Sequence, residues 1–231
     1  MLVAGGHKKR LVINLPPRHG KSTLISKYFP AWYLGMFPKR NIAMISSKSN
    51  LAEGFGEGAR EALRDYGPQL FGTHVDPNHE GKGDWKTKQG GGMFAKTWSS
   101  SGITGRNTDI IILDDILSND ATAISPVMRE KQWDWFTKTL LQRCEPHTAI
   151  IIVMTRWHRQ DIVGKLEMEA HKPAYQVGYP WEFIRLPALA EENDPLGRLP
   201  GEALWPEVHP KEHLEKLKLD TAPSAWQGAV S

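Results

Sequence analysis

Gly20, Lys21 and Ser22 have the types and the order that phosphate binding requires. They lie in the segment LPPRHGKST at 15–23, which follows an apolar stretch and precedes a helical one. Glycine lets the backbone approach a phosphate, and the first N–H groups of a helix point at the anion. The lysine supplies positive charge, and the serine hydroxyl can ligate Mg²⁺. The segment therefore predicts a nucleotide-binding loop, although Leu15 replaces the first glycine of the usual pattern and an ordinary strand–helix turn is the alternative. The predicted loop residues are Pro17, Arg18, His19, Gly20, Lys21, Ser22 and Thr23.

Two adjacent carboxylates, Asp114 and Asp115, follow an apolar run. A buried strand that delivers an acid at its carboxyl end is typical of the second half of a nucleotide-hydrolysing site. We expect Asp114 to hold Mg²⁺, directly or through water, and Asp115 to orient and deprotonate the attacking water. A helix cap or a solvated turn is the alternative for such a pair taken alone.

Three further polar residues are candidates for work on the phosphates. Arg106 ends a small, polar loop and could stabilise charge on the γ-phosphate, in trans if the protein forms a ring. Thr155 and Arg156 end a later apolar strand. Thr155 is a candidate sensor of the γ-phosphate, and Arg156 is a candidate second sensor or DNA contact. The alternative for Arg106 is an exposed arginine on a loop.

Apolar segments that alternate with helical stretches predict the scaffold for these residues. Strands that are apolar throughout are typical of a mostly parallel sheet buried on both faces, so we expect a three-layer α/β sandwich. The predicted strands are Leu11–Leu15, Asn41–Ser46, Asp109–Leu113, Thr148–Met154 and Glu182–Leu189, and the predicted helices are Lys21–Tyr33, Leu51–Tyr66, Pro126–Arg143, Arg159–Ala170 and Glu212–Leu219. Ser125 should cap the third helix, with Pro126 at its first position.

Two regions differ from this alternation. The segment Asp84–Ser101 is typical of a hairpin or a pair of short strands. Its Lys86, Lys88 and Lys96 lie among tryptophans and could contact a DNA backbone. The alternative there is a plain solvated hairpin. After residue 190 the chain becomes rich in proline and charge, which predicts a nucleotide-binding domain at 1–190 and a small linker subdomain at 191–231.

Composition narrows the class of protein further. Hydrophobic residues make up 40% and charged residues 24% of the 231 residues, which is typical of a globular chain. The longest apolar run, Ala149–Met154, is far shorter than the roughly 20 residues that span a bilayer, so we expect no membrane partner. The single Cys144 excludes an internal disulfide, and we expect a soluble intracellular protein. The first 50 residues contain nine Lys and Arg and no acid, which favours a polyanionic ligand although the net charge is only +3.

The motifs LPPRHGKST, DIIILDDIL and IIVMTRWHRQDIVGKL, with the loop ITGRNTD, resemble the large terminase subunit of tailed bacteriophages. The resemblance covers roughly residues 10–170. It implies a RecA-like P-loop fold of the ASCE class, with helices on both faces of the sheet. It also implies a catalytic carboxylate at Asp115, a nucleotide-responsive Arg18, a trans-acting Arg106 and a coupling role for Thr155. Aspartate at position 115 departs from the glutamate that is commonest in the family.

The resemblance further implies an ATPase, with ATP and Mg²⁺, that pumps double-stranded DNA into a procapsid in the host cytoplasm. The expected partners are the portal protein, the small terminase subunit and further copies of the chain, in a ring that the family suggests is a pentamer, or a monomer in isolation. The family's nuclease domain is missing from this sequence, so we expect no DNA cleavage. Two alternatives stay open: a helicase or other nucleic-acid translocase, and a non-hydrolysing nucleotide switch that binds DNA.

Overall fold

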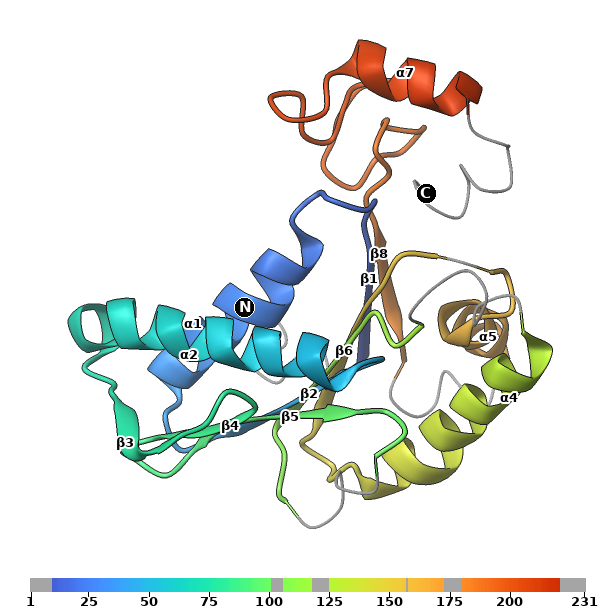
Figure 1. Ribbon diagram of the computed structural model, residues 1–231. Coiled ribbons are helices and arrows are strands. Elements are labelled where there is room, and N and C mark those ends of the chain that lie inside the picture. The colour runs from blue at the N-terminus through green and yellow to red at the C-terminus, as the bar shows by residue number, and fades with distance from the viewer. Residues whose placement is uncertain (1–9, 101–105, 118–124, 157, 173–179, 221–231) are drawn as a thin grey trace.

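The computed structural model describes residues 10–100, 106–117, 125–156, 158–172 and 180–220, and within them an eight-stranded sheet forms the centre of the molecule (Figure 1). The strand order is β3-β4-β5-β2-β6-β7-β1-β8. The strands are β1 (Arg10–Asn14), β2 (Asn41–Ser46), β3 (Val75–Glu80), β4 (Asp84–Thr87), β5 (Gly92–Thr97), β6 (Ile110–Asp114), β7 (Ala149–Val153) and β8 (Glu182–Arg185). The neighbouring strands in the part β5-β2-β6-β7-β1-β8 pair in parallel, whereas β4 pairs antiparallel with both β3 and β5.

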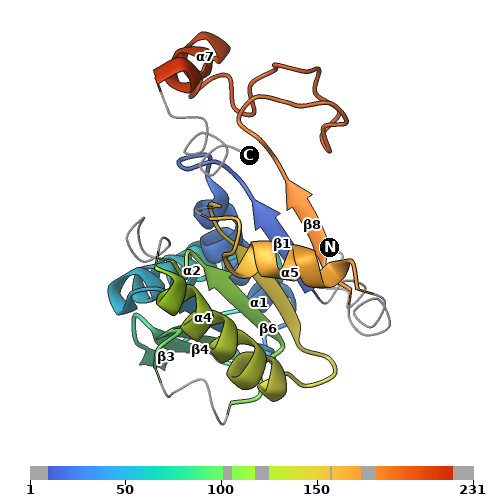
Figure 2. The same ribbon diagram turned by 90° about the vertical axis from the view of Figure 1, so that its right-hand side faces the viewer.

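Helices cover both faces of this sheet, which confirms the predicted three-layer fold (Figures 1 and 2). Each face has its own apolar cluster: α1 and α2 pack on one face, and α4, η3 and α5 pack on the other. The helices are η1 (Thr23–Tyr28, a π-helix), α1 (Phe29–Met36), α2 (Ser49–Phe71), α4 (Pro126–Trp135), η3 (Phe136–Leu140, a π-helix), η4 (Leu141–Arg143, a 3₁₀ turn), α5 (Ile162–Ala170) and α7 (Lys211–Asp220). Every residue of β6 and β7 is buried, as two-sided coverage requires.

Two element ends and one additional strand differ from the sequence prediction for local physical reasons, and helix α1 also runs three residues further than predicted, to Met36. Helix α2 continues through Pro68 to Phe71 and ends at Gly72, whose φ of 67° provides a left-handed cap. Strand β3 was not predicted, because its sequence VDPNHE is polar and contains a proline that only an edge strand tolerates. Strand β8 stops at Arg185, since Pro187 cannot donate to a ladder. The hairpin β4-β5 and the Ser125 cap, whose hydroxyl accepts from the Met128 N–H, are as predicted.

Beyond β8 the chain forms a segment at 186–220, here called the C-terminal segment, that stands above the carboxyl edge of the sheet (Figures 1 and 2). Its small apolar cluster contains Ala188, Leu189, Ala203 and Leu214 of α7. The predicted division between 190 and 191 stays a prediction. Among the described helices, each is too short or too polar to cross a bilayer.

Candidate nucleotide-binding site

The segment predicted to bind phosphate joins β1 to the helix that begins at Lys21. Two of its residues have left-handed backbone: Arg18 has a φ of 61° and Gly20 has a φ of 76°. Glycine adopts such a φ without strain, whereas arginine rarely does. The loop therefore makes a tight turn, and it places the N-terminus of the helix at the carboxyl edge of the sheet.

Strand order explains why distant residues meet at this edge. Strand β7 separates β1 from β6, and Asp114 pairs in register with Val153, which precedes Met154 and Thr155. The carboxyl ends of parallel neighbours lie together, so the loop after β1 and the residues that end β6 and β7 form one site. The predicted proximity of the loop and the acidic pair is thus present.

Lys21 lies at the centre of this site. Its Nζ donates to Asp115 Oδ2 at 3.0 Å and to Thr155 Oγ1 at 2.9 Å, and its side chain is only 9% exposed. Thr155 N–H in turn donates to Asp115 Oδ1 at 3.3 Å. The proposed phosphate-binding, catalytic and coupling side chains therefore contact one another directly. Asp115 itself has a φ of 43°, an uncommon conformation for a residue other than glycine.

Asp114 lies beside Ser22, the other residue expected to hold the cation. Ser22 Oγ donates to Asp114 Oδ1 at 3.1 Å. A second hydroxyl, from Ser26, donates to Asp114 Oδ2. Sequence reasoning missed Ser26, because the phosphate-loop pattern ends before it and a serine in a helix carries no signal of its own.

The electrostatics of the acidic pair are unequal. Asp114 is fully buried, and burial together with the neighbouring charge of Asp115 raises the pKa of Asp114 to about 6. Hydrogen bonds from Ser26 and Ser22 oppose this rise in its pKa. A buried carboxylate with two hydroxyl donors is the kind of group that a divalent cation stabilises. Mg²⁺ commonly uses one or two protein oxygens plus substrate phosphates, so Ser22 and Asp114 fit this ion.

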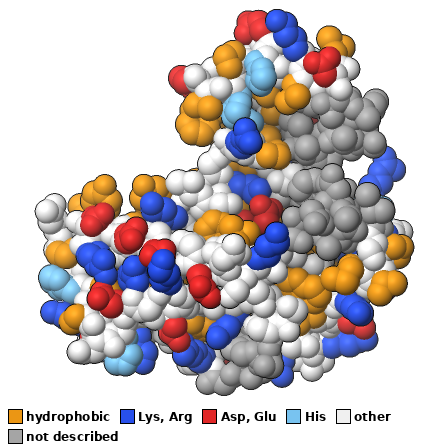
Figure 3. All heavy atoms as spheres, viewed as in Figure 1, with side chains coloured by type: hydrophobic (Ala, Val, Ile, Leu, Met, Phe, Trp, Pro, Cys, Tyr) orange, Lys and Arg blue, Asp and Glu red, His pale blue; other side chains and the backbone are white. Residues whose placement is uncertain are grey.

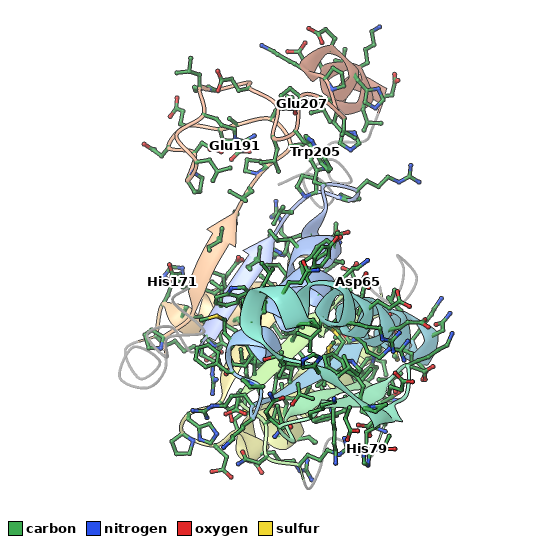
Figure 4. The ribbon with its side chains drawn as sticks, turned by 90° about the vertical axis from the view of Figure 1, so that its left-hand side faces the viewer. Asp65, His79, His171, Glu191, Trp205 and Glu207 are labelled. Atoms are coloured by element: carbon green, nitrogen blue, oxygen red, sulfur yellow. The ribbon has the colours of Figure 1, made fainter. Side chains whose placement is uncertain are left out.

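Sequence reasoning also missed a contact between the loop and the C-terminal segment. The His19 and His209 rings stack with centroids 4.4 Å apart, and His209 Nε2 donates to the Arg18 carbonyl at 3.3 Å. A Cβ at Gly20 would lie 3.8 Å from the Trp205 ring, and Trp205 is on the side of the segment that faces the rest of the protein (Figure 4). Burial lowers the pKa of His19. The contact thus places two rings of the C-terminal segment against the loop.

Pro17, Arg18 and Thr23 of the loop are exposed, and among the described residues the side-chain hydrogen bonds of Asp114 and Asp115 come from Lys21, Ser22, Ser26 and Thr155. Arg106 is also remote from the loop of its own chain. It forms a bidentate ion pair with Asp84, at 2.8 and 2.6 Å, and its guanidinium lies over the Phe94 ring. Phe94 is in β5, four strand spacings or roughly 19 Å from β1.

Arg156 contacts carboxylates next to the site. Its Nε is 3.2 Å from Asp161 Oδ2, and its Nη1 donates to both oxygens of Glu167 at 3.0 Å. Asp161 also caps α5 by accepting from the Gly164 N–H. The arginine therefore joins the end of β7 to α5. Trp157, which follows it in the motif, lies outside the described residues.

The lysines predicted to contact DNA, Lys86, Lys88 and Lys96, lie on the β4-β5 hairpin, and the first two are exposed. Trp85 is fully buried, with its indole N–H donating to the Gly56 carbonyl, so it offers no stacking surface. On the face shown in Figure 3, basic and acidic side chains are interspersed along α2 and the hairpin, where Lys82 pairs with Glu57.

The sequence of this chain matches a known protein family. The family model described as the N-terminal part of the T4likevirus-type terminase large subunit matches residues 12–219. The chain belongs to this family. The resemblance of its motifs to large terminases is therefore confirmed. None of the curated proteins matches the chain.

Solved terminase structures share the fold. A mutant of the large terminase ATPase domain of Thermus phage P74-26 is 16% identical, with a TM-score of 0.57, over 100% of this chain and 92% of that one. The large terminase of bacteriophage HK97 is 11% identical, with a TM-score of 0.58, over 99% of this chain. The match covers 48% of the HK97 chain, so this terminase sequence spans about half of that protein.

Proposed function

We propose that this terminase chain is a Mg²⁺-dependent ATPase motor domain that moves double-stranded DNA into a procapsid. The observation that carries the proposal is the contact of Lys21 with both Asp115 and Thr155 at the carboxyl edge of the sheet. Membership in the terminase large-subunit family supports packaging over the alternatives of a helicase and a non-hydrolysing switch.

Each residue of the site has its own proposed role in hydrolysis. A triphosphate in the loop would compete with Asp115 for the Lys21 ammonium, because phosphate oxygens are strong acceptors for lysine. Asp115, released from that ion pair, could accept a proton from the attacking water. Thr155 is hydrogen-bonded to both Lys21 and Asp115, so a change of partner at Lys21 would also move the end of β7. Mg²⁺, held by Ser22 and Asp114, would offset charge on the phosphate oxygens.

The position of Arg106 supports a role in trans. Because it lies about four strands from its own loop, a neighbouring copy in a ring would have to present the phosphate that it contacts. We further propose that the working assembly is a ring, bound to the portal protein and the small terminase subunit in the host cytoplasm. Lys86, Lys88 and Lys96 remain proposed DNA contacts.

The test combines turnover with nucleotide binding in two variants. Lys21→Ala should abolish ATP hydrolysis and weaken binding, whereas Asp115→Asn should retain binding and lose hydrolysis. Lys27→Ala is the matched control, since Lys27 lies on the same helix and stacks over Tyr28 instead of reaching the site. Equal hydrolysis by the wild type and Lys21→Ala would overturn the proposal. A nicking assay on the Lys21→Ala protein checks separately that the chain does not cleave DNA.

A further inference from the structure

Ser26 occupies a position at which an apolar residue would be expected. It is fully buried, and its helical neighbour Ile25 packs against the apolar cluster that contains Ile13 of β1 and Leu34 of α1. An unpartnered hydroxyl in such surroundings is costly, so a buried serine needs a hydrogen-bond acceptor. Ser26 Oγ has one in Asp114 Oδ2.

The local backbone is unusual at the same place. Residues Thr23–Tyr28 form a π-helix, and the Phe29 N–H accordingly donates to the Leu24 carbonyl, five residues earlier. Short π-helical stretches inside α-helices are rare and occur frequently at functional sites. Here the stretch contains Ser26 and begins directly after Ser22, so both hydroxyls that contact Asp114 come from this irregular start of the helix.

We propose that Ser26 is a positioning residue for the divalent cation of this site. A carboxylate can rotate about its terminal torsion, which is broad and roughly two-fold. With Oδ2 fixed by Ser26, Asp114 keeps Oδ1 beside Ser22, the hydroxyl that would share the cation. Ser26 also supplies a donor that does not itself have to bind the cation. The inference rests on the proposed function of the site as a Mg²⁺–nucleotide site.

The experiment measures how nucleotide binding depends on Mg²⁺. A fluorescent ATP analogue is titrated onto the wild type and Ser26→Ala, without metal and over a range of Mg²⁺ concentrations. Loss of a residue that orients a metal ligand commonly weakens metal affinity 10–100-fold. We expect Ser26→Ala to raise the Mg²⁺ concentration for half-maximal binding about tenfold, with metal-free binding unchanged.

A control separates this effect from general loss of stability. Thr73→Val removes another buried hydroxyl bond, from Thr73 Oγ1 to the Gly35 carbonyl at 2.8 Å, away from the site. It should lower the melting temperature and leave the Mg²⁺ midpoint unchanged. A Ser26→Ala protein that behaves like Thr73→Val would overturn the proposal.

A second variant keeps the test decisive if Ser26→Ala fails to fold. Ser26→Cys has nearly the same shape but a weaker donor, so its Mg²⁺ midpoint should lie above the wild-type value. An unchanged midpoint in Ser26→Cys would reject the role of Ser26 while leaving the proposed function intact. A wild type that shows no Mg²⁺-dependent nucleotide binding would reject both.

Discussion

Replacing Asp114 with asparagine should stabilise the protein while removing the carboxylate that we assign to the cation. Burial and the charge of Asp115 raise the pKa of Asp114 from 3.8 to about 6. A carboxyl group whose pKa is higher in the folded state than in the unfolded state disfavours folding once it ionises. The fold therefore loses stability as the pH rises between about 4 and 6, and Asp114→Asn avoids that loss.

The size of the effect follows from the difference in pKa. At about 1.4 kcal/mol for each tenfold change in an equilibrium, a rise from 3.8 to about 6 corresponds to about 3 kcal/mol at pH 7.5. At pH 5, where much of the folded-state carboxyl group is protonated, about half of that difference should remain. Asparagine is close to aspartate in shape, and its carbonyl can still accept a hydrogen bond from Ser22.

Urea unfolding at pH 7.5 and at pH 5, in the absence of nucleotide and metal, measures both values. Asp115→Asn provides the contrast, because it leaves the buried Lys21 ammonium without its 3.0 Å ion-pair partner and should lower stability. An Asp114→Asn protein that is less stable than the wild type at pH 7.5 would refute the reasoning. So would a stability difference that is the same at both pH values.

Three further predictions concern the residues around this centre. Arg106→Ala should lower turnover only at protein concentrations where copies associate. Asp84→Asn frees the Arg106 guanidinium from its ion pair, so it should lower the protein concentration at which turnover rises. Wild-type turnover per molecule that does not depend on protein concentration would contradict a role in trans. Thr155→Val should retain nucleotide binding and reduce hydrolysis, with Thr155→Ser as the control that keeps the hydroxyl; equal turnover in all three proteins would exclude coupling. His209→Ala should expose the His19 ring, so that NMR titration shows the pKa of His19 rising toward 6.5. The lost stacking should lower the free energy of unfolding by about 1 kcal/mol. An unchanged pKa of His19 would contradict this prediction.

The parts of this structure that sequence predicts well depend on local patterns. The strand at 41–46 matches its prediction residue for residue, because a run that is apolar throughout can be satisfied only by burial on both faces. The Gly-Lys-Ser pattern between an apolar strand and a helix predicts Lys21 and Ser22, and the two aspartates are predicted because they come directly after an apolar run. The carboxyl ends of parallel strands meet, so these residues were expected to lie together.

The parts that sequence does not predict depend on partners far along the chain. The contact between His19 and His209 joins residues that are 190 positions apart, and nothing near either histidine indicates the other. Arg106 follows a polar loop, and it pairs with Asp84, which only the folded chain brings close. The partners of Arg156, Asp161 and Glu167, are nearer in the sequence, but no local pattern indicates that they pair with it. Ser26 is the same kind of case, since its acceptor on β6 is 88 residues away.

A crystal structure with a non-hydrolysable ATP analogue and Mg²⁺ tests the central claim most directly. We predict that Lys21 Nζ leaves Asp115 for a phosphate oxygen, and that the cation lies between Ser22 and Asp114. An analogue bound elsewhere on the protein, with the ion pair between Lys21 and Asp115 still in place, would contradict the account.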